Sequence, residues 1–333
     1  MKETDLVITW VDGNDPVWQE TFRQSAGTAA DMSYLYRDWG WLPYWFRSME
    51  KSIPWIRRIH FVTCGHLPAW LNIHHPKLHI VRHEDYIPPA YLPTFSSHTI
   101  EWNLYRIPDL AEQFILCSDD MFFLQPLPED AYFRAGLPCD VLRICPVTES
   151  RARSFHHLLL NNMAVLNRHY DMHACAAEHP DLWFSSRYPE SIRRENEAAL
   201  CWNRFPGLYY DHMPMPLLKS SLEELWNTEG PLLDQICRRP MRDFHTDVNL
   251  YLARFWNLAR GRFIPYCRAR GVYCLVSDPE SRIINVITGD TPLLCLNDIG
   301  ADVHRETRKQ LILSLFAERF PAASSFELPG SRV

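Results

Sequence analysis

The sequence predicts an α/β protein with an open, mostly parallel, Rossmann-like sheet and a helical insertion over its ligand-binding edge. Short apolar runs alternate with helix-like segments along the first third of the chain, as in sheets whose strands are joined by crossover helices. Acidic residues stand within or just after several of these runs. Ligands of such sheets bind beyond the carboxyl ends of the strands, so we expect the acids on the binding edge.

The first half of the chain supplies most of the expected sheet. The runs that we predict as strands are rich in aliphatic and aromatic residues, and they cover 5–13, 58–65, 78–85 and 114–124. A helix is predicted over 40–53, where apolar residues recur at mixed three- and four-residue spacing. In the segment 99–110, a second helix is predicted up to residue 107. The residue before a proline disfavours the helical region, so the helix should end before Pro108.

The second half is predominantly helical. Helical periodicity or capping residues predict helices over 154–170, 220–236, 243–261 and 303–319. The Pro- and Met-rich segment 209–220 is predicted as a loop, and 292–298 as a weaker strand.

We predict a single catalytic unit over 1–320, followed by a frayed tail over 321–333. Within the unit we expect an α/β core (1–148), a mainly helical insertion (149–290) and a return strand with a final helix (291–320).

Composition narrows the function classes. The 333 residues are 47% apolar and 22% charged, as in ordinary globular proteins, and the net charge of −6 gives no reason to expect nucleic-acid binding. No run approaches the 18 apolar residues of a membrane span, and the polar start MKETDLVITW does not resemble a signal peptide. The ten cysteines form no C-x-x-C pair, which favours reduced thiols. A cytoplasmic location is therefore expected.

Two adjacent carboxylates interrupt the apolar stretch FILCSDDMFFL. Asp119 and Asp120 would cost several kcal/mol or more if they were buried without a partner. One interpretation is a divalent cation, because Mg²⁺ and Mn²⁺ prefer carboxylate oxygens. The other is a turn at the end of a strand, in which the aspartates accept hydrogen bonds from backbone N–H groups. The stretch alone leaves both open.

Several longer stretches resemble the Stealth family. They are ITWVDGNDPVW (8–18), RDWGWLPYWFRSMEKSIPWIRRIHFVTCG (37–65), LPTFSSHTIEWNLYRIPDLAEQFILCSDDMFF (92–123), YYDHMPMPLLKS (209–220) and the short CLND (295–298). The resemblance covers nearly the whole chain in order. It implies a nucleotide-sugar-transferase-like α/β core. It also implies a Mg²⁺- or Mn²⁺-dependent transfer of a hexose-1-phosphate, such as N-acetylglucosamine-1-phosphate, from a UDP-sugar to a sugar hydroxyl of a glycan. The products would be a phosphodiester and UMP, as in capsular or cell-surface polysaccharide synthesis.

The resemblance also implies roles for ten residues. The implied catalytic residues are His212, Arg242 and Asp15; the implied substrate-binding residues are Asp12, Arg37, Asp38, Ser97 and Glu101; the implied metal ligands are Asp119 and Asp120. Three positions depart from the family pattern, where asparagine is found: Ser118 precedes the acidic pair, Cys64 stands in the VTCG turn, and Asp12 is asparagine in some relatives. These departures leave the donor sugar open. The implied partners are a UDP-sugar and an acceptor glycan, and the resemblance also allows peripheral contact with capsule assembly machinery at the inner face of the membrane.

Each role has a chemical rationale and an ordinary alternative. His212 has an unperturbed pKa near ~6.5 and suits a general base, yet a loop histidine is more often a hydrogen-bonding residue. Arg242 could hold phosphate oxygens through two N–H groups, yet it could equally form a surface ion pair. Trp10 and Trp102 could stack on uracil or sugar, or simply fill the core.

Two other functions compete with phosphotransfer. An ordinary metal-dependent glycosyltransferase would release UDP. A catalytically inactive glycan-binding subunit would have lost the acids, the histidine or the arginine, and all of them are present.

Overall fold

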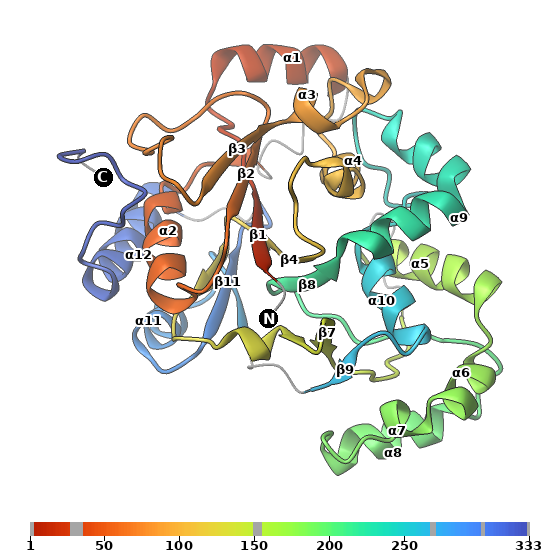
Figure 1. Ribbon diagram of the computed structural model, residues 1–333. Coiled ribbons are helices and arrows are strands. Elements are labelled where there is room, and N and C mark those ends of the chain that lie inside the picture. The colour runs from red at the N-terminus through yellow and green to blue at the C-terminus, as the bar shows by residue number, and fades with distance from the viewer. Residues whose placement is uncertain (1–2, 27–35, 149–154, 267–270, 301–303, 332–333) are drawn as a thin grey trace.

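The computed structural model describes residues 3–26, 36–148, 155–266, 271–300 and 304–331. A five-stranded sheet runs through the molecule with helices packed on both of its faces (Figure 1). Its strand order is β3-β2-β1-β4-β8, in which the first four strands are parallel and β8 is antiparallel to β4. The predicted fold class is confirmed.

The strands of the described residues form this sheet and two smaller ones. They are β1 (Thr4–Thr9), β2 (Ile59–Thr63), β3 (Leu78–Arg82), β4 (Gln113–Ser118), β5 (Met121–Phe123), β6 (Phe133–Arg134), β7 (Leu137–Asp140), β8 (Met215–Leu218), β9 (Ile264–Pro265), β10 (Gly271–Leu275) and β11 (Leu293–Asn297). The smaller sheets have the orders β10-β11-β5 and β6-β7-β9.

The helices cover both faces of the main sheet and the edge beside β8 (Figure 1). They are α1 (Pro16–Ala26), α2 (Leu42–Ser52), α3 (His83–Tyr86), α4 (Ser97–Trp102), α5 (Phe155–His169), α6 (Met172–Glu178), α7 (Pro180–Trp183), α8 (Glu190–Ala199), α9 (Lys219–Cys237), α10 (Tyr251–Ala259), α11 (Glu280–Thr288) and α12 (Arg305–Arg319). None of the helices in the described ranges is both long and apolar enough to cross a bilayer.

The central strands are buried on both faces because their alternating side chains enter two separate cores. Leu6 and Ile8 of β1 belong to the core beneath α2 and α12, whereas Val7 between them belongs to the core beneath α9 and α10. All three side chains are 0% exposed. A continuous apolar run is therefore the correct signature of this parallel strand.

Several predicted elements are shorter than expected. The run 114–124 is two strands in different sheets, β4 and β5, separated by a turn at the acidic pair. The helix predicted over 99–110 is α4 followed by a 3₁₀ turn at Leu104–Arg106. Of the helix predicted over 243–261, only α10 is helical, since Asp243 accepts hydrogen bonds from the His245 N–H and the Thr246 hydroxyl and holds the preceding residues in a turn.

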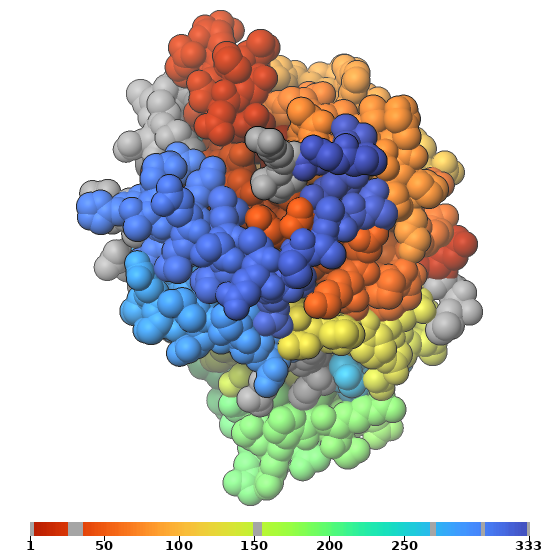
Figure 2. All heavy atoms as spheres, turned by 90° about the vertical axis from the view of Figure 1, so that its left-hand side faces the viewer, coloured from red at the N-terminus to blue at the C-terminus, as the bar shows by residue number. Residues whose placement is uncertain are grey.

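Two further predictions were wrong in kind. The loop predicted over 209–220 contains β8, which pairs with β4 at the edge of the sheet, where the missing N–H of Pro216 is tolerated. The tail was expected to fray, but its described part packs against the first half of the chain, as the dark blue segment in Figure 2 shows. Phe326 is 2% exposed and lies 5.2 Å from the ring of Phe46, and Glu327 accepts two hydrogen bonds from Arg47 at 2.8 and 2.6 Å.

A buried polar network ties the amino-terminal ends of three strands together, at the opposite end from the site described below. Asp5 at the start of β1 is 0% exposed and accepts two hydrogen bonds from Arg57, at 2.7 and 2.6 Å. It also lies 2.9 Å from His60 Nε2 and accepts a hydrogen bond from the Ala111 N–H at 2.8 Å. Burial would raise the pKa of Asp5, but the hydrogen bonds from Arg57 and His60 prevail and lower it to about 2.

This network predicts acid-sensitive stability. The pKa of Asp5 is lower in the folded state than its ordinary value of 3.8, so its ionisation stabilises the fold above that value and ceases to do so as the pH falls through 2. The contribution is about 2 kcal/mol. We expect Asp5→Asn to be less stable than the wild type by about 3 kcal/mol at neutral pH, with the difference shrinking between pH 4 and pH 2. Urea unfolding at a series of pH values measures it.

Glu84→Gln is the matched control, because the Glu84 side chain is 69% exposed and has only a 3.5 Å ion pair with Arg82. Its stability should follow that of the wild type at every pH. A stability difference for Asp5→Asn that stays constant down to pH 2 would contradict the role given to ionised Asp5.

Candidate active site

A cleft opens at the carboxyl ends of β1 and β4, where parallel sheets of this type bind ligands. The end of β1 contributes residues 9–11, the end of β4 contributes 118–120, and the end of β11 contributes 296–298. Side chains from α4 and from two segments of the second half, at His212 and Arg242, complete its wall. Residues far apart in the sequence therefore meet at one edge of the sheet, as predicted.

The acidic pair lies in the turn between β4 and β5. Oδ2 of Asp120 accepts hydrogen bonds from Cys295 Sγ at 3.3 Å and from Asn297 Nδ2 at 3.2 Å, and the Asp120 carbonyl accepts one from the Leu296 N–H at 2.9 Å. Oδ1 of Asp120 is buried and has no partner among the described residues. Burial, followed by the charges of Asp120 and Asp38, raises the pKa of Asp119 to about 8. The pair is thus short of positive charge.

The donor atoms around Asp120 fit a divalent cation. Oxygen of Asp120, a ring nitrogen of His212 and the sulfur of Cys295 all lie within 4.8 Å of one another. Burial and the charge of Asp120 raise the pKa of the Cys295 thiol well above its ordinary value, so this group donates a hydrogen bond and remains protonated. The free Oδ1 of Asp120 and the neighbouring Asp119 leave oxygen ligands, which suit Mg²⁺ or Mn²⁺ better than softer metals.

His212 lies in the segment that leads into β8, near the carboxylates of Asp120 and Glu101. Its Nε2 is 3.8 Å from Oδ2 of Asp120, and its side chain is 38% exposed. Burial would lower the pKa of His212, but the hydrogen bond and charge of Asp120, with the charges of Glu101 and Asp211, raise it above the ordinary value. The raised pKa makes this imidazole a stronger base than a free histidine side chain.

Glu101 faces this histidine from the last turn of α4. Burial raises the pKa of Glu101 to about 7, although the charges of Arg242 and His212 oppose the rise. A carboxyl group that titrates near neutral pH can both accept and donate a proton under working conditions. The resemblance implied a substrate-binding role for Glu101, with Glu101 and Asp15 as the next candidates for the base after His212, and the raised pKa of Glu101 is compatible with either role.

Arg242 lines the cleft beside Glu101. The Tyr36 hydroxyl donates a hydrogen bond to the Phe95 carbonyl at 2.7 Å, and Arg242 in turn interacts with the Tyr36 side chain. Burial raises the pKa of this phenol, while the charge and hydrogen bond of Arg242 lower it. The guanidinium is therefore oriented from one side and still borders the cavity, where its remaining N–H groups can reach phosphate oxygens.

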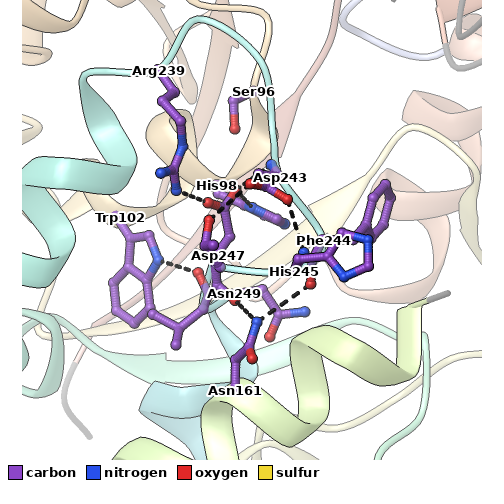
Figure 3. A network of polar contacts seen from close by, with 12 residues as sticks. Ser96, His98, Trp102, Asn161, Arg239, Asp243, Phe244, His245, Asp247 and Asn249 are labelled. Carbon is purple, nitrogen blue, oxygen red and sulfur yellow. Dashed lines mark hydrogen bonds and ion pairs between the residues drawn. The ribbon is translucent and has the colours of Figure 1, made fainter. Parts of the chain in front are cut away.

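The segment that carries Arg242 is fixed to α4 by a network centred on Asp247 (Figure 3). Asp247 is 1% exposed; it pairs with Arg239 and accepts a hydrogen bond from the Asp243 N–H at 2.8 Å. Its Oδ2 also lies 2.9 Å from Nδ1 of His98, which belongs to the same helix as Glu101. The Trp102 indole donates a hydrogen bond to the Val248 carbonyl at 2.9 Å. This network sets the position of Arg242 relative to Glu101.

The other predicted residues fall into three groups. Arg37 and Ser97 line the cleft, and Arg37 Nη1 forms an ion pair with Asp298 at 3.3 Å. Asp38 lies behind the lining, where its carboxylate accepts a hydrogen bond from the Gly40 N–H at 2.8 Å and its charge acts on Asp119.

Asp12 and Asp15 are not among the residues that line the cleft. Asp12 accepts a hydrogen bond from the Asn14 N–H at 2.9 Å, and Asp15 accepts one from the Trp18 N–H at 2.7 Å, which caps the start of α1. Seven of the ten predicted residues therefore line the cleft, Asp38 lies behind it, and Asp12 and Asp15 lie in the adjoining turn.

The structure also answers the question about the two tryptophans and adds an acid. Trp10 borders the cleft, whereas Trp102 is 0% exposed and belongs to the core. Asp298 was not predicted as a site residue, although it ends the CLND block. It lines the cleft, and its Oδ2 accepts a hydrogen bond from the Trp39 indole at 3.1 Å. Asp298 could not be placed at the cleft from the local sequence, because its partner Trp39 lies 259 residues away in the chain.

Comparison with known proteins decides the family. The Stealth conserved region 1 matches residues 5–25, and the Stealth conserved region 2 matches residues 35–139. The capsular polysaccharide phosphotransferase WcwK of Streptococcus pneumoniae is 37% identical over 97% of this chain and 98% of its own length. The chain belongs to the Stealth family. The receptor polysaccharide phosphotransferase WefC of Streptococcus gordonii is 31% identical over 98% of this chain and 100% of its own, and the exopolysaccharide phosphotransferase cps2G of Lactiplantibacillus plantarum is 29% identical over 98% and 96%.

This Stealth protein is an enzyme of the phosphotransferase class. The two matched regions contain every predicted residue except His212 and Arg242. Those two come from the second half of the chain, and the fold delivers them to the cleft formed by the matched regions.

Proposed function

We propose that this Stealth protein transfers a hexose-1-phosphate from a UDP-sugar to a hydroxyl group of an acceptor glycan, in the synthesis of a capsular or cell-surface polysaccharide. The observation that carries the proposal is the meeting of Asp119, Asp120, His212, Glu101 and Arg242 around one cleft. Phosphoryl transfer needs neutralisation of charge, a positioned nucleophile and an acceptor for its proton, and these residues offer all three. The relatives named as polysaccharide phosphotransferases support the same reaction class.

The chemistry balances as a single displacement. The acceptor oxygen attacks the phosphorus that bears the sugar, and the bond from that phosphorus to the bridging oxygen breaks. UMP leaves with the electron pair, and the proton of the attacking hydroxyl passes to the imidazole of His212. Arg242 holds oxygens of the transferred phosphate, and Glu101, whose pKa is about 7, stabilises the protonated imidazole.

We assign a divalent cation, Mg²⁺ or Mn²⁺, to the carboxylates of Asp119 and Asp120. When bound there, it would offset the negative charge of the acids and of the pyrophosphate. We assign His212 the role of proton acceptor and not of metal ligand. These hard cations prefer oxygen ligands, and Oδ1 of Asp120 is free among the described residues. A UDP-sugar donor also favours action in the cytoplasm, which we include in the proposal.

The test is incubation with a panel of UDP-sugars, Mg²⁺ or Mn²⁺ and candidate glycans, with UMP and UDP quantified separately. We expect UMP in equal amount to a phosphodiester visible by ³¹P NMR, and loss of both products with EDTA. Stoichiometric UDP with a phosphorus-free product would replace the proposal with an ordinary glycosyltransferase reaction, in which the attack occurs on the sugar carbon.

A further inference from the structure

A second cavity meets the cleft on the other side of the reacting residues. The two cavities share Ser97, Glu101, Ser118, His212 and Arg242 in their walls. The acidic pair borders the first cavity at Asp119 and Asp120, whereas neither of these acids lines the second. The site therefore has two approaches that converge on His212.

The second cavity has a different character, because apolar and aromatic side chains form most of its wall. Met213 and Met215 line one side, and Phe155 and Tyr251 line another. Phe155, at the start of α5, is 37% exposed, so part of its ring is open to a ligand. Its ring lies 5.9 Å from that of Tyr251 and 5.4 Å from that of Tyr210, so three aromatic rings cluster at this approach.

The polar groups of this second wall are mostly engaged already. His98 is held by Asp247 at 2.9 Å (Figure 3). The Asn249 side-chain oxygen accepts a hydrogen bond from Asn162 at 2.7 Å. The groups at the junction with the first cavity are less firmly held: the ion pair of His212 with Asp120 spans 3.8 Å. A charged group of a ligand would thus be recognised at the junction. An uncharged, apolar face of the ligand would be recognised by the wall of the second cavity beyond the junction.

The geometry of in-line displacement indicates which cavity holds the leaving group and which admits the attacking hydroxyl. The attacking and leaving oxygens must lie on opposite sides of the transferred phosphorus. The acids and the cation that they would hold belong on the side of the UMP leaving group. The attacking hydroxyl must therefore arrive from the opposite side, next to the base His212. Of the two cavities that border His212 among the described residues, the second does not border Asp119 or Asp120.

We propose that the second cavity is the acceptor subsite and binds one pyranose unit of the acceptor glycan, with the C–H face of the sugar against the ring of Phe155. This inference rests on the proposed function. A pyranose combines an uncharged apolar face with hydroxyl groups at its rim, which matches an aromatic wall beside a polar junction. The cavity continues into the catalytic junction, so the bound hydroxyl would lie beside His212.

The test separates the kinetic constants for donor and acceptor in Phe155 variants. The probes are a UDP-sugar that supports UMP release and a panel of methyl pyranosides and short oligosaccharides as acceptors. We expect Phe155→Leu to raise the acceptor KM by about two- to tenfold, because the aromatic face is lost while the apolar volume is kept. Phe155→Trp should restore the acceptor KM, and the donor KM should change by less than about twofold in both. Leu160→Ala, on the same helix and outside both cavities, should leave both constants unchanged.

The outcomes are distinct. UMP release by the wild type with an unchanged acceptor KM in Phe155→Leu would overturn the subsite and leave the proposed function intact, as would a rise confined to the donor KM. A panel in which no glycoside is phosphorylated while UMP forms by hydrolysis would also overturn the subsite. Absence of UMP with every UDP-sugar would overturn the proposed function, and the acceptor assignment with it.

Discussion

Asp120→Asn is expected to lower turnover by roughly 10³-fold or more, because it removes the carboxylate oxygen that we assign to the cation. The fold should survive, since the exchange removes the charge of Asp120, which acts together with burial to raise the pKa of Asp119 to about 8. In the absence of metal, the Tm of the variant should equal or exceed that of the wild type. Steady-state UMP release and thermal unfolding measure the two effects.

A readout that does not depend on activity makes this prediction sharper. Mn²⁺ at about 100 times its Kd should stabilise the wild type by about 2.7 kcal/mol and should barely stabilise Asp120→Asn. Asp109→Asn is the control: the Asp109 side chain is 80% exposed and its nearest cation, on Arg58, lies 3.9 Å away. An active, EDTA-insensitive Asp120→Asn would return the acidic pair to a turn at the end of a strand.

His212→Ala should lower kcat by about 10²- to 10⁴-fold, the usual contribution of a general base, while donor binding stays nearly intact. The side chain acts on the proton of the acceptor and makes no essential contact with the donor in our proposal. Calorimetric titration with the UDP-sugar, beside single-turnover rates, separates the two quantities. His74→Ala, at an exposed position away from the cleft, is the control and should behave as the wild type.

Arg242→Lys provides the contrasting pattern. Lysine keeps the positive charge and loses the planar pair of donors, so donor binding should weaken by about tenfold, with a loss of turnover beside it. If His212→Ala instead binds the donor much more weakly and turns over normally at saturation, His212 is a donor ligand. Glu101, with its pKa of about 7, is then the first candidate for the base.

The parallel core was predictable because each strand carries its own signal. The strands β1, β2 and β3 lie where they were expected. β1 and β2 are buried on both faces, which demands such apolar runs, whereas β3 at the edge of the sheet is only partly buried. β8 was missed for a tertiary reason: its Met-Pro sequence is suited to a strand only at a sheet edge, and the edge is not visible in a local window. The packing of the tail was missed for the same reason. Phe326 is buried only by its contact with Phe46, which a local stretch of the tail sequence does not reveal.

The site residues that lie in a recognisable family motif could be predicted from the sequence. Asp119, Asp120, His212 and Arg242 were all placed by resemblance, and the structure brings them together. What the motif could not supply is electrostatics: the raised pKa of Glu101 arises from burial, which depends on α4 packing against the segment before α10. Phe155 belongs to no motif, and its exposure becomes informative only beside the second cavity.

The contacts around Asp120 also fix the order in which the enzyme can become competent during its synthesis. Its partners Cys295 and Asn297 follow it by 175 and 177 residues, and Asp298 follows its partner Arg37 by 261. At about 5–20 residues per second, a ribosome takes roughly 10 to 35 seconds to move from the acidic pair to these partners. Over that interval the nascent chain carries the acids of the cleft without the strand that orients them. We therefore expect a chain that is interrupted before β11 to lack activity, because it lacks the strand that orients Asp120.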